Sequence, residues 1–168
     1  MAIRDIMQLG HEALRAKAQP IINIQSQATQ DLMRDLFDTL ANTEGVGIAA
    51  PQIGQSWRMI IVASRPSARY PSAPEMPATL MINPSFEPLD NNQAKDWEGC
   101  LSIPSIRAQV PRYKHIKISY TNVQGEPEEK ELTDFVARVF QHEYDHLNGL
   151  VYLDRVETNR DIISEAEF

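Results

Sequence analysis

Cysteine is almost absent from this sequence, which contains one, Cys100. A single thiol cannot form a disulfide within the chain, so covalent crosslinks are excluded as a source of stability and a reducing compartment is expected. A chain of 168 residues is long enough to bury a hydrophobic core without crosslinks. Because the sequence also lacks repeats and low-complexity segments, we expect a single catalytic domain over residues 1–168.

Long hydrophobic runs and an excess of positive charge are missing as well. No stretch approaches the roughly eighteen apolar residues that a membrane-spanning helix needs, and charged side chains interrupt residues 1–20, which argues against a secretory signal. The net charge of −7 argues against nucleic acid as a partner. We therefore expect a cytoplasmic protein that binds neither membranes nor nucleic acid.

What the sequence does contain is the pattern His-Glu-x-x-His at residues 142–146. On a helix, the two histidines lie on one face and can bind the same metal ion, with Glu143 close enough to take a proton from water. About 100° per residue places this trio in one arc with the apolar residues Phe135, Val136, Val139, Phe140 and Leu147. Four residues fall outside this predicted buried arc: Arg138, Gln141, Tyr144 and Asp145.

The buried arc predicts a metal site, because a carboxylate among apolar residues is costly unless a cation compensates its charge. The alternative is an amphipathic helix whose histidines only form hydrogen bonds in the core. That alternative explains neither the second histidine nor the inward position of Glu143. A catalytic metal usually takes three protein ligands and keeps one position open, so one more ligand is needed.

Two residues could supply the third ligand. Glu165 follows His146 by 19 residues, near the spacing found in some zinc proteases. Cys100 follows Gly99, which permits a close backbone approach, and precedes Pro104, which stiffens the chain. We favour the cysteine, because a lone thiol in a chain with an incomplete ligand set is better explained by its reactivity than by packing.

A third segment, residues 44–54, has the sequence Glu-Gly-Val-Gly-Ile-Ala-Ala-Pro-Gln-Ile-Gly and leaves the backbone largely bare. Such a stretch suits a substrate that binds to main-chain donors and acceptors. A tight turn between a helix and a strand would have a similar composition, so the segment alone is weak evidence. It is not a phosphate-binding loop, because no Lys-Ser or Lys-Thr pair follows it.

Hydrophobic periodicity predicts a helix over residues 30–40 and a second one, carrying the histidines, from Thr133 or Asp134 to residues 148–149. Strands are predicted near residues 58–63, 79–83, 108–110, 115–121 and 130–132. The intervening loop with four prolines between residues 66 and 77 is expected to be mobile. These elements predict an α+β fold in which antiparallel or mixed strands pack around a central buried helix that carries the histidine motif.

Three motifs in this order resemble those of the peptide deformylases, metal hydrolases that remove the formyl group from the N-terminal formylmethionine of new bacterial and organellar proteins. The motifs are Gly45-Val46-Gly47-Ile48-Ala49-Ala50-Pro51-Gln52, Glu98-Gly99-Cys100-Leu101-Ser102 and Gln141-His142-Glu143-Tyr144-Asp145-His146-Leu147. The resemblance covers nearly the whole chain. Its implied metal ligands are Cys100, His142 and His146.

By the same resemblance, Glu143 is the general base and acid, and Gln52 and the backbone amide of Leu101 bind the formyl oxygen as it becomes an oxyanion. The implied substrate-binding residues are Gly45, Val46, Gly47, Arg107 and Val139. Of these, Arg107 could equally be a solvated strand residue. The implied metal is Fe(II), with zinc, nickel or cobalt as substitutes. The implied partners are N-formylmethionyl nascent peptides near the ribosome exit, met by a monomeric enzyme.

Two other functions stay open from the sequence. A zinc protease that uses Glu165 as its third ligand would leave Cys100 and the glycine-rich segment without a role. A non-catalytic relative that binds metal or formylated peptide would not need Glu143 as a base. The chain also departs from many family members, which continue into a long C-terminal helix, whereas residues 154–168 alone follow the last predicted hydrophobic pair, Tyr152-Leu153.

Overall fold

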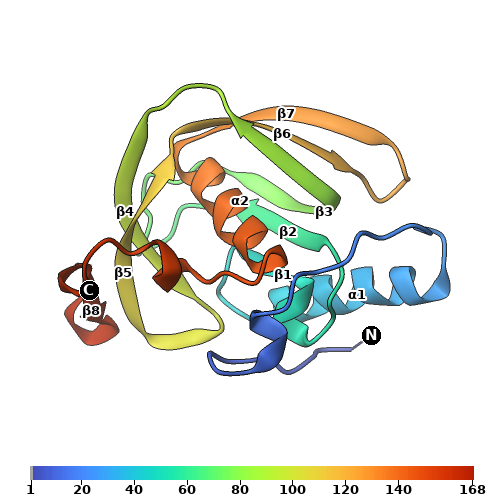
Figure 1. Ribbon diagram of the computed structural model, residues 1–168, viewed down its shortest axis with the longest axis horizontal. Helices are drawn as coiled ribbons and strands as arrows, with labels where there is room; N and C mark the ends of the chain where they lie inside the picture. The colour runs from blue at the N-terminus through green and yellow to red at the C-terminus, as the bar shows by residue number, and fades with distance from the viewer. Residues whose placement is uncertain (1) are drawn as a thin grey trace.

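The computed structural model describes residues 2–168 and has an α+β fold (Figure 1). The strands are β1 (Gly47–Ala49), β2 (Met59–Ser64), β3 (Met76–Pro88), β4 (Gln93–Cys100), β5 (Ile103–Tyr113), β6 (His115–Thr121), β7 (Pro127–Thr133) and β8 (Ile162–Ser164). The α-helices are α1 (Gln27–Ala41) and α2 (Asp134–Leu147). Short 3-10 helices are η1 (Glu12–Leu14), η2 (Ala50–Ile53), η3 (Tyr152–Arg155), η4 (Asn159–Asp161) and η5 (Glu165–Glu167).

The strands form two sheets. One has the order β1-β2-β3-β6-β7 and the other has the order β4-β5-β8, and every pair of neighbouring strands in both is antiparallel. The predicted α+β class with antiparallel sheets is thereby confirmed. No helix within residues 2–168 has the length and apolar character needed to cross a membrane.

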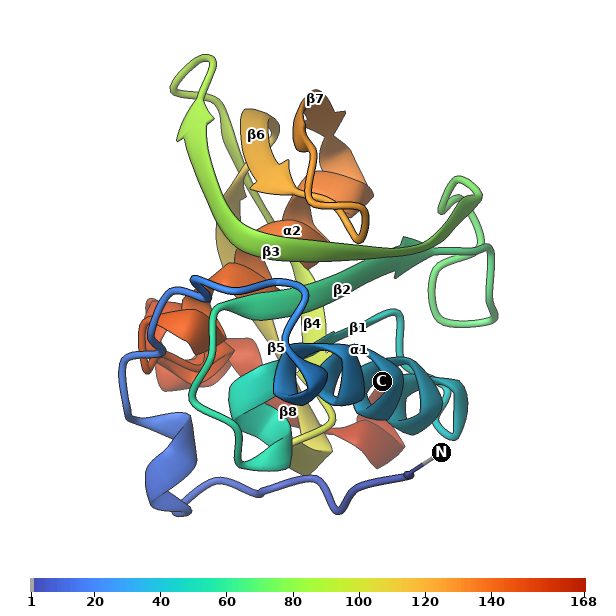
Figure 2. The ribbon, with the colours of Figure 1, turned by 90° about the vertical axis from the view of Figure 1, so that its right-hand side faces the viewer.

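Strand β2 is covered by a different helix on each face, as Figure 2 shows. Its side chains alternate, so Met59 and Ile61 pack in the cluster beneath α1 while Ile60 and Val62 pack with α2. Helix α1 begins at residue 27, three residues before the predicted start, because Ser26 accepts a hydrogen bond from the Thr29 N–H and caps it. The two helices therefore hold β2 and the adjoining β1 in fixed positions.

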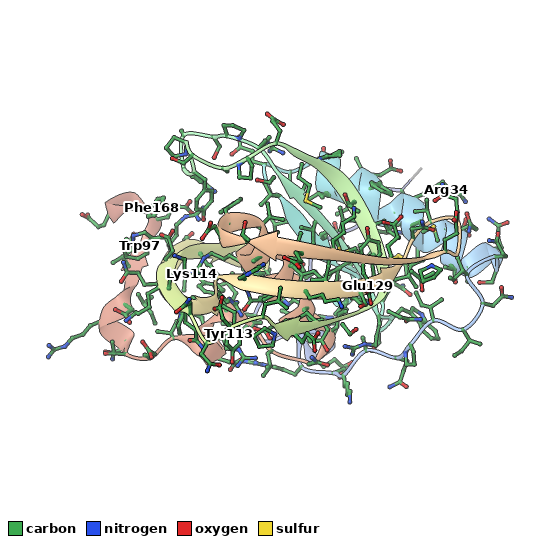
Figure 3. All side chains as sticks on the ribbon, turned by 90° about the horizontal axis from the view of Figure 1, so that it is seen from above. Arg34, Trp97, Tyr113, Lys114, Glu129 and Phe168 are labelled. Atoms are coloured by element: carbon green, nitrogen blue, oxygen red, sulfur yellow. The ribbon has the colours of Figure 1, made fainter. Side chains whose placement is uncertain are left out.

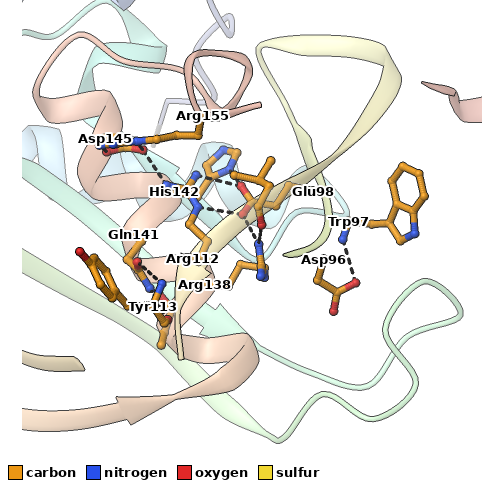
Figure 4. A network of polar contacts seen from close by, with 12 residues as sticks. Asp96, Trp97, Glu98, Arg112, Tyr113, Arg138, Gln141, His142, Asp145 and Arg155 are labelled. Carbon is orange, nitrogen blue, oxygen red and sulfur yellow. Dashed lines mark hydrogen bonds and ion pairs between the residues drawn. The ribbon is translucent and has the colours of Figure 1, made fainter. Parts of the chain in front are cut away.

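Helix α2 is buried on its polar side as well as its apolar side, so the predicted arc was too narrow. Three residues predicted outside the arc are buried: Arg138, Gln141 and Asp145. The physical reason is the second sheet, whose β4–β5 hairpin covers the polar side and supplies hydrogen-bond partners there (Figure 4). The pairs are Arg138 with Glu98, Gln141 with the Tyr113 backbone, and Asp145 with Arg112.

Three strands are absent from the sequence prediction: β1, β4 and β8. Strand β1 lies in the glycine-rich segment, which the sequence indicated only as a substrate-binding stretch or a tight turn. Most of β4 is polar and much of it is exposed, because it is an edge strand, so it lacks the hydrophobic period that marks a strand. Strand β8 has three residues and depends on pairing with β5. Strand β3 is also longer than predicted and includes Pro77, which the sequence prediction assigned to a loop.

Candidate active site

The predicted metal ligands meet between β4 and α2. Cys100 ends β4, while His142 and His146 lie about one turn apart on α2. One donor atom from each residue lies within 4.8 Å of the other two, and Cys100 Sγ is 3.5 Å from His146 Nε2. Ligand bonds of about 2.3 Å to sulfur and about 2.0 Å to nitrogen in a tetrahedral site would separate the two donors by roughly 3.5 Å. The cluster therefore has the dimensions of a metal site.

The unpaired polar atoms around this cluster also fit a divalent cation. Within residues 2–168, Glu143 Oε2 and His146 Nδ1 are buried without a hydrogen-bond partner. Burial raises the pKa of Glu143 to about 7 and lowers the pKa of His146 well below its ordinary value. Burial also lowers the pKa of His142, but hydrogen bonds with Cys100 and Glu98 outweigh it and raise that pKa. A bound metal ion would displace the proton of His142. Its positive charge would also offset the cost of burying the Glu143 carboxylate.

Glu98 on β4 orients the first histidine, as Figure 4 shows. Its Oε1 lies 2.8 Å from His142 Nδ1, which donates to the carboxylate and leaves Nε2 for a metal. Arg112 donates to the two Glu98 oxygens at 2.9 and 3.0 Å, and Arg138 donates to Oε2 at 2.7 Å. Burial alone would raise the pKa of Glu98, but Arg112 and His142 hold it well below its usual range. Glu98 is therefore an ionised acceptor with four donors.

No spacing rule marks Glu98 in the sequence, where it is simply the first residue of the cysteine motif. Its role depends on β4, which sequence periodicity does not predict, and on two arginines distant in the chain. The sequence offers one indication, an acidic residue two positions before a candidate ligand.

Glu98→Gln should weaken metal binding about 10–100-fold, because the amide is a poor acceptor for His142. It should also lower the free energy of unfolding by about 3–5 kcal/mol, since the buried Arg112 and Arg138 charges lose their shared partner. Chelator competition measures the first effect and urea denaturation the second. The exposed Glu126→Gln variant, in the β6–β7 turn, is the matched control. Unchanged metal affinity in Glu98→Gln would rule out an orienting role.

Gln52 in η2 directs its amide toward the same cluster. Its Oε1 accepts a hydrogen bond from the Ala49 N–H at 2.9 Å, and its Nε2 donates to Ser102 Oγ at 3.1 Å. These bonds fix the amide so that Nε2 lies 3.7 Å from Cys100 Sγ. A donor held in this way is suited to stabilising negative charge beside the three candidate metal ligands.

The glycine-rich segment has no side chains at Gly45 and Gly47 because Leu101 and Glu143 occupy the space that those side chains would need. A Cβ atom on Gly47 would lie 2.9 Å from Glu143 Cγ and Oε1, and one on Gly45 would lie 3.1 Å from Leu101 Cδ1. A methyl group at position 47 would therefore displace the Glu143 carboxylate. The close approach explains the composition better than a simple turn does, because residues 47–49 form β1.

A cleft of about 690 Å³ opens beside this cluster. It is lined by all five residues predicted to bind substrate: Gly45, Val46, Gly47, Arg107 and Val139. Gln52, Leu101 and Glu143 line it too, as do residues 67–70 of the proline-containing loop, which the sequence did not point to. Arg107 is buried, so the reading of it as a solvated strand residue is wrong.

Glu165, the other candidate ligand, lies elsewhere in the cleft. Its Oε1 is 2.7 Å from Arg69 and 3.2 Å from Arg107, and the donor group that could hold a metal does not include it. This placement removes the third ligand that a zinc protease reading requires. A thiol and two imidazoles converging beside a buried carboxylate, on the wall of a cleft, instead define a metal-dependent hydrolase of a different class.

Comparison with known proteins identifies that class. Residues 3–161 match the family model for polypeptide deformylase. Peptide deformylase 2 of Nostoc sp. is 51% identical over 163 residues, or 97% of this chain and 91% of the relative. Peptide deformylase 1 of Xanthomonas campestris is 43% identical over 155 residues, or 92% of this chain and 91% of the relative.

A solved structure agrees with these relatives. The Met-Ala-Ser-bound class I type b peptide deformylase from Acinetobacter baumannii has a TM-score of 0.88 and 40% sequence identity, and the match covers 92% of this chain and 99% of that one. The chain belongs to the peptide deformylase family. It is a metal-dependent hydrolase that removes the N-formyl group from newly made proteins.

Proposed function

We propose that this chain acts as one catalytic domain on N-formylmethionyl nascent peptides, with Cys100, His142 and His146 as the metal ligands. The convergence of these three donors beside buried Glu143 carries the proposal. We also propose Fe(II) as the metal in the cell, by resemblance to the family, although two imidazoles and a thiolate suit zinc equally well. The enzyme would be a cytoplasmic monomer that meets its substrates near the ribosome exit.

Glu143 would move the proton in this reaction. When bound, a divalent ion lowers the pKa of a water toward about 7 and polarises the formyl carbonyl. Glu143 Oε2 has no partner within residues 2–168, and burial raises the pKa of this carboxyl to about 7. It would accept a proton from the attacking water and return it to the leaving amine, as a base with a pKa near the working pH can.

Gln52 and Leu101 would stabilise the oxyanion that forms from the formyl oxygen. Gln52 Nε2 is already held beside Cys100 by its bonds to Ala49 and Ser102, so it need not reorganise during the reaction. The backbone N–H of Leu101, in the turn after β4, would be the second donor. Preorganised donors of this kind are worth roughly 3 kcal/mol each.

The peptide would lie in the cleft between the edges of two sheets. Strand β1 is the first strand of one sheet and β4 the first of the other, so both have a free edge, and residues of both line the cleft. An extended peptide can pair with such edges. Val46 and Val139 would contact the methionine side chain, and the Met-Ala-Ser complex of the relative supports a cleft for short peptides that begin with methionine. Helix α2 would serve as the central, rigid support of this site.

Release of formate from a formyl-Met-Ala-Ser peptide tests the proposal. The protein should be loaded anaerobically with Fe(II), and in parallel with Ni(II) and Zn(II), with metal content measured in each sample. We expect formate from metal-loaded protein and none after chelation. Protein that contains stoichiometric metal in all three forms but releases no formate would refute the proposed function.

Gln52→Leu should reduce kcat about 10²–10³-fold while KM changes little, because the lost donor acts on a charge that exists only in the transition state. Steady-state kinetics with formyl-Met-Ala-Ser measure both constants. Gln124→Leu is the control, because it makes the same substitution at an exposed position in the β6–β7 turn, away from the candidate active site. A raised KM with unchanged kcat would show that Gln52 binds the ground state instead.

A further inference from the structure

The C-terminal residues lie against the wall of the cleft. Strand β8 pairs with residues 106–108 of β5, and this pairing carries Glu165, the next residue, to the cleft. Phe168 lies beside Trp97, with ring centroids 5.7 Å apart, as seen at one end of the molecule in Figure 3. Glu165 thus belongs to the surroundings of the substrate, and the proposed reaction gives it no role.

Glu165 joins two arginines that come from different parts of the chain. Its Oε1 is 2.7 Å from Arg69 Nη2 and accepts from Nε and Nη2 of Arg107 at 3.2 Å each. We call Arg69, Arg107 and Glu165 the tail cluster. Arg107 is buried and also donates to the Tyr70 hydroxyl at 3.0 Å, whereas the Arg69 side chain is 48% exposed. Two positive charges therefore face one negative charge.

The free edge of β4 ends close to this cluster. The Trp97 carbonyl accepts from the Tyr70 hydroxyl at 3.2 Å, and the Trp97 N–H donates to Asp96 Oδ1 at 2.8 Å. The β4–β5 register is irregular between Glu98 and Cys100, so Gly99 has no paired residue on β5, and it lines the cleft. A peptide that runs antiparallel to β4 from Cys100 would pair at Gly99 and leave the edge before Trp97.

The tail cluster lies where such a peptide would leave the strand. A Cβ atom on Gly99 would be 2.9 Å from Arg107 Cζ and Nη1, so this guanidinium lies directly against the Gly99 backbone. At about 3.3 Å per residue, the third residue of an extended peptide lies about 7 Å beyond the first. With the first residue at the metal ligands, the third comes beside Arg107 and its neighbour Arg69.

Resting on the proposed function, we propose that the tail cluster is a specificity site that favours an acidic side chain at the third residue of the formylated peptide. Arg69 is the group that would bind it, because Glu165 is its one ion-pair partner within residues 2–168 and its side chain is half exposed. The other charged residues of the cleft wall are Glu44, Arg65, Glu98, Arg138 and Glu143. Glu98 and Arg138 pair with each other, and Arg65 donates to the Glu44 backbone.

The test measures turnover of three peptide amides, formyl-Met-Ala-Glu, formyl-Met-Ala-Gln and formyl-Met-Ala-Lys, by the metal-loaded protein. The amide end removes the terminal carboxylate, so the third side chain is the only variable charge. The wild type should prefer Glu over Lys about two- to fivefold in kcat/KM at low ionic strength. Arg69→Gln should bring this ratio close to one, and Glu165→Gln should raise it. Salt at about 1 M should bring all the Glu-to-Lys ratios closer to one, because it screens the charges.

Arg34→Gln is the matched control, because Arg34 is an exposed, ion-paired arginine on α1 at the opposite end of the molecule (Figure 3). It should leave the Glu-to-Lys ratio at the wild-type value. A wild-type ratio of one or less, or a ratio that neither cluster variant changes, would overturn the specificity site. Failure to release formate from the neutral Gln peptide would instead overturn the proposed function, so the two failures are distinct.

Discussion

Glu143→Gln should keep its metal and lose nearly all turnover. The amide has almost the same shape as the carboxyl and fits against Gly47, where a Cβ atom would already be too close. It cannot accept a proton, however, and general-base catalysis of this kind contributes about 10²–10⁴-fold. We therefore expect kcat for formyl-Met-Ala-Ser to fall by that factor. Metal content is measured on the same sample by elemental analysis.

The fold should tolerate this change, because burial raises the pKa of Glu143 to about 7 and the protein therefore already accommodates a neutral group there at neutral pH. Circular dichroism and the urea midpoint check that the variant is folded. Parallel loss of metal and activity would show that Glu143 supports the site structurally and that another group is the base.

Cys100→Ser should abolish stoichiometric metal binding, and activity with it. A serine hydroxyl is far less acidic than a thiol and is a harder ligand, so the site would retain two imidazoles and no anionic donor. Glu165→Ala should leave metal content at the wild-type level, because Glu165 contacts Arg69 and Arg107 and lies outside the donor cluster. Both variants are measured by metal analysis after dialysis against a weak chelator.

The pair of variants separates two ligand sets that the sequence leaves open. If Glu165→Ala emptied the site and Cys100→Ser stayed metallated, the tail would have to reach the metal and the protease reading would return. If both variants lost the metal, the C-terminal tail would be needed for metal binding because it supports the folded site, and not because it supplies a ligand. The second result would also weaken the assignment of Arg107 to peptide binding.

The histidine helix is predictable because its geometry is local. Residues four apart share a face whatever surrounds the helix, so His142 and His146 can be paired from spacing alone. The third ligand is a different case. Cys100 and Glu165 lie in segments whose positions depend on how β4 and β8 pair with β5, and those contacts are non-local.

The polar side of α2 could not be predicted for the same reason. Arg138 and Asp145 have the appearance of surface residues when the helix is considered alone. They are buried because Glu98 and Arg112 on the other sheet complete their hydrogen bonds. Periodicity measures apolar character, so it misses a buried interface made of paired charges.

The division of the donor atoms between layers has a thermodynamic consequence. Cys100 belongs to the three-stranded sheet, whereas the two histidines belong to a helix whose apolar side packs on the five-stranded sheet. An ion bound by all three residues would crosslink the three-stranded sheet to helix α2. Its binding free energy would therefore stabilise the packing of that sheet against the rest of the fold. A loss of metal would then loosen the β4–β5 hairpin first, and with it the wall on which the peptide is aligned.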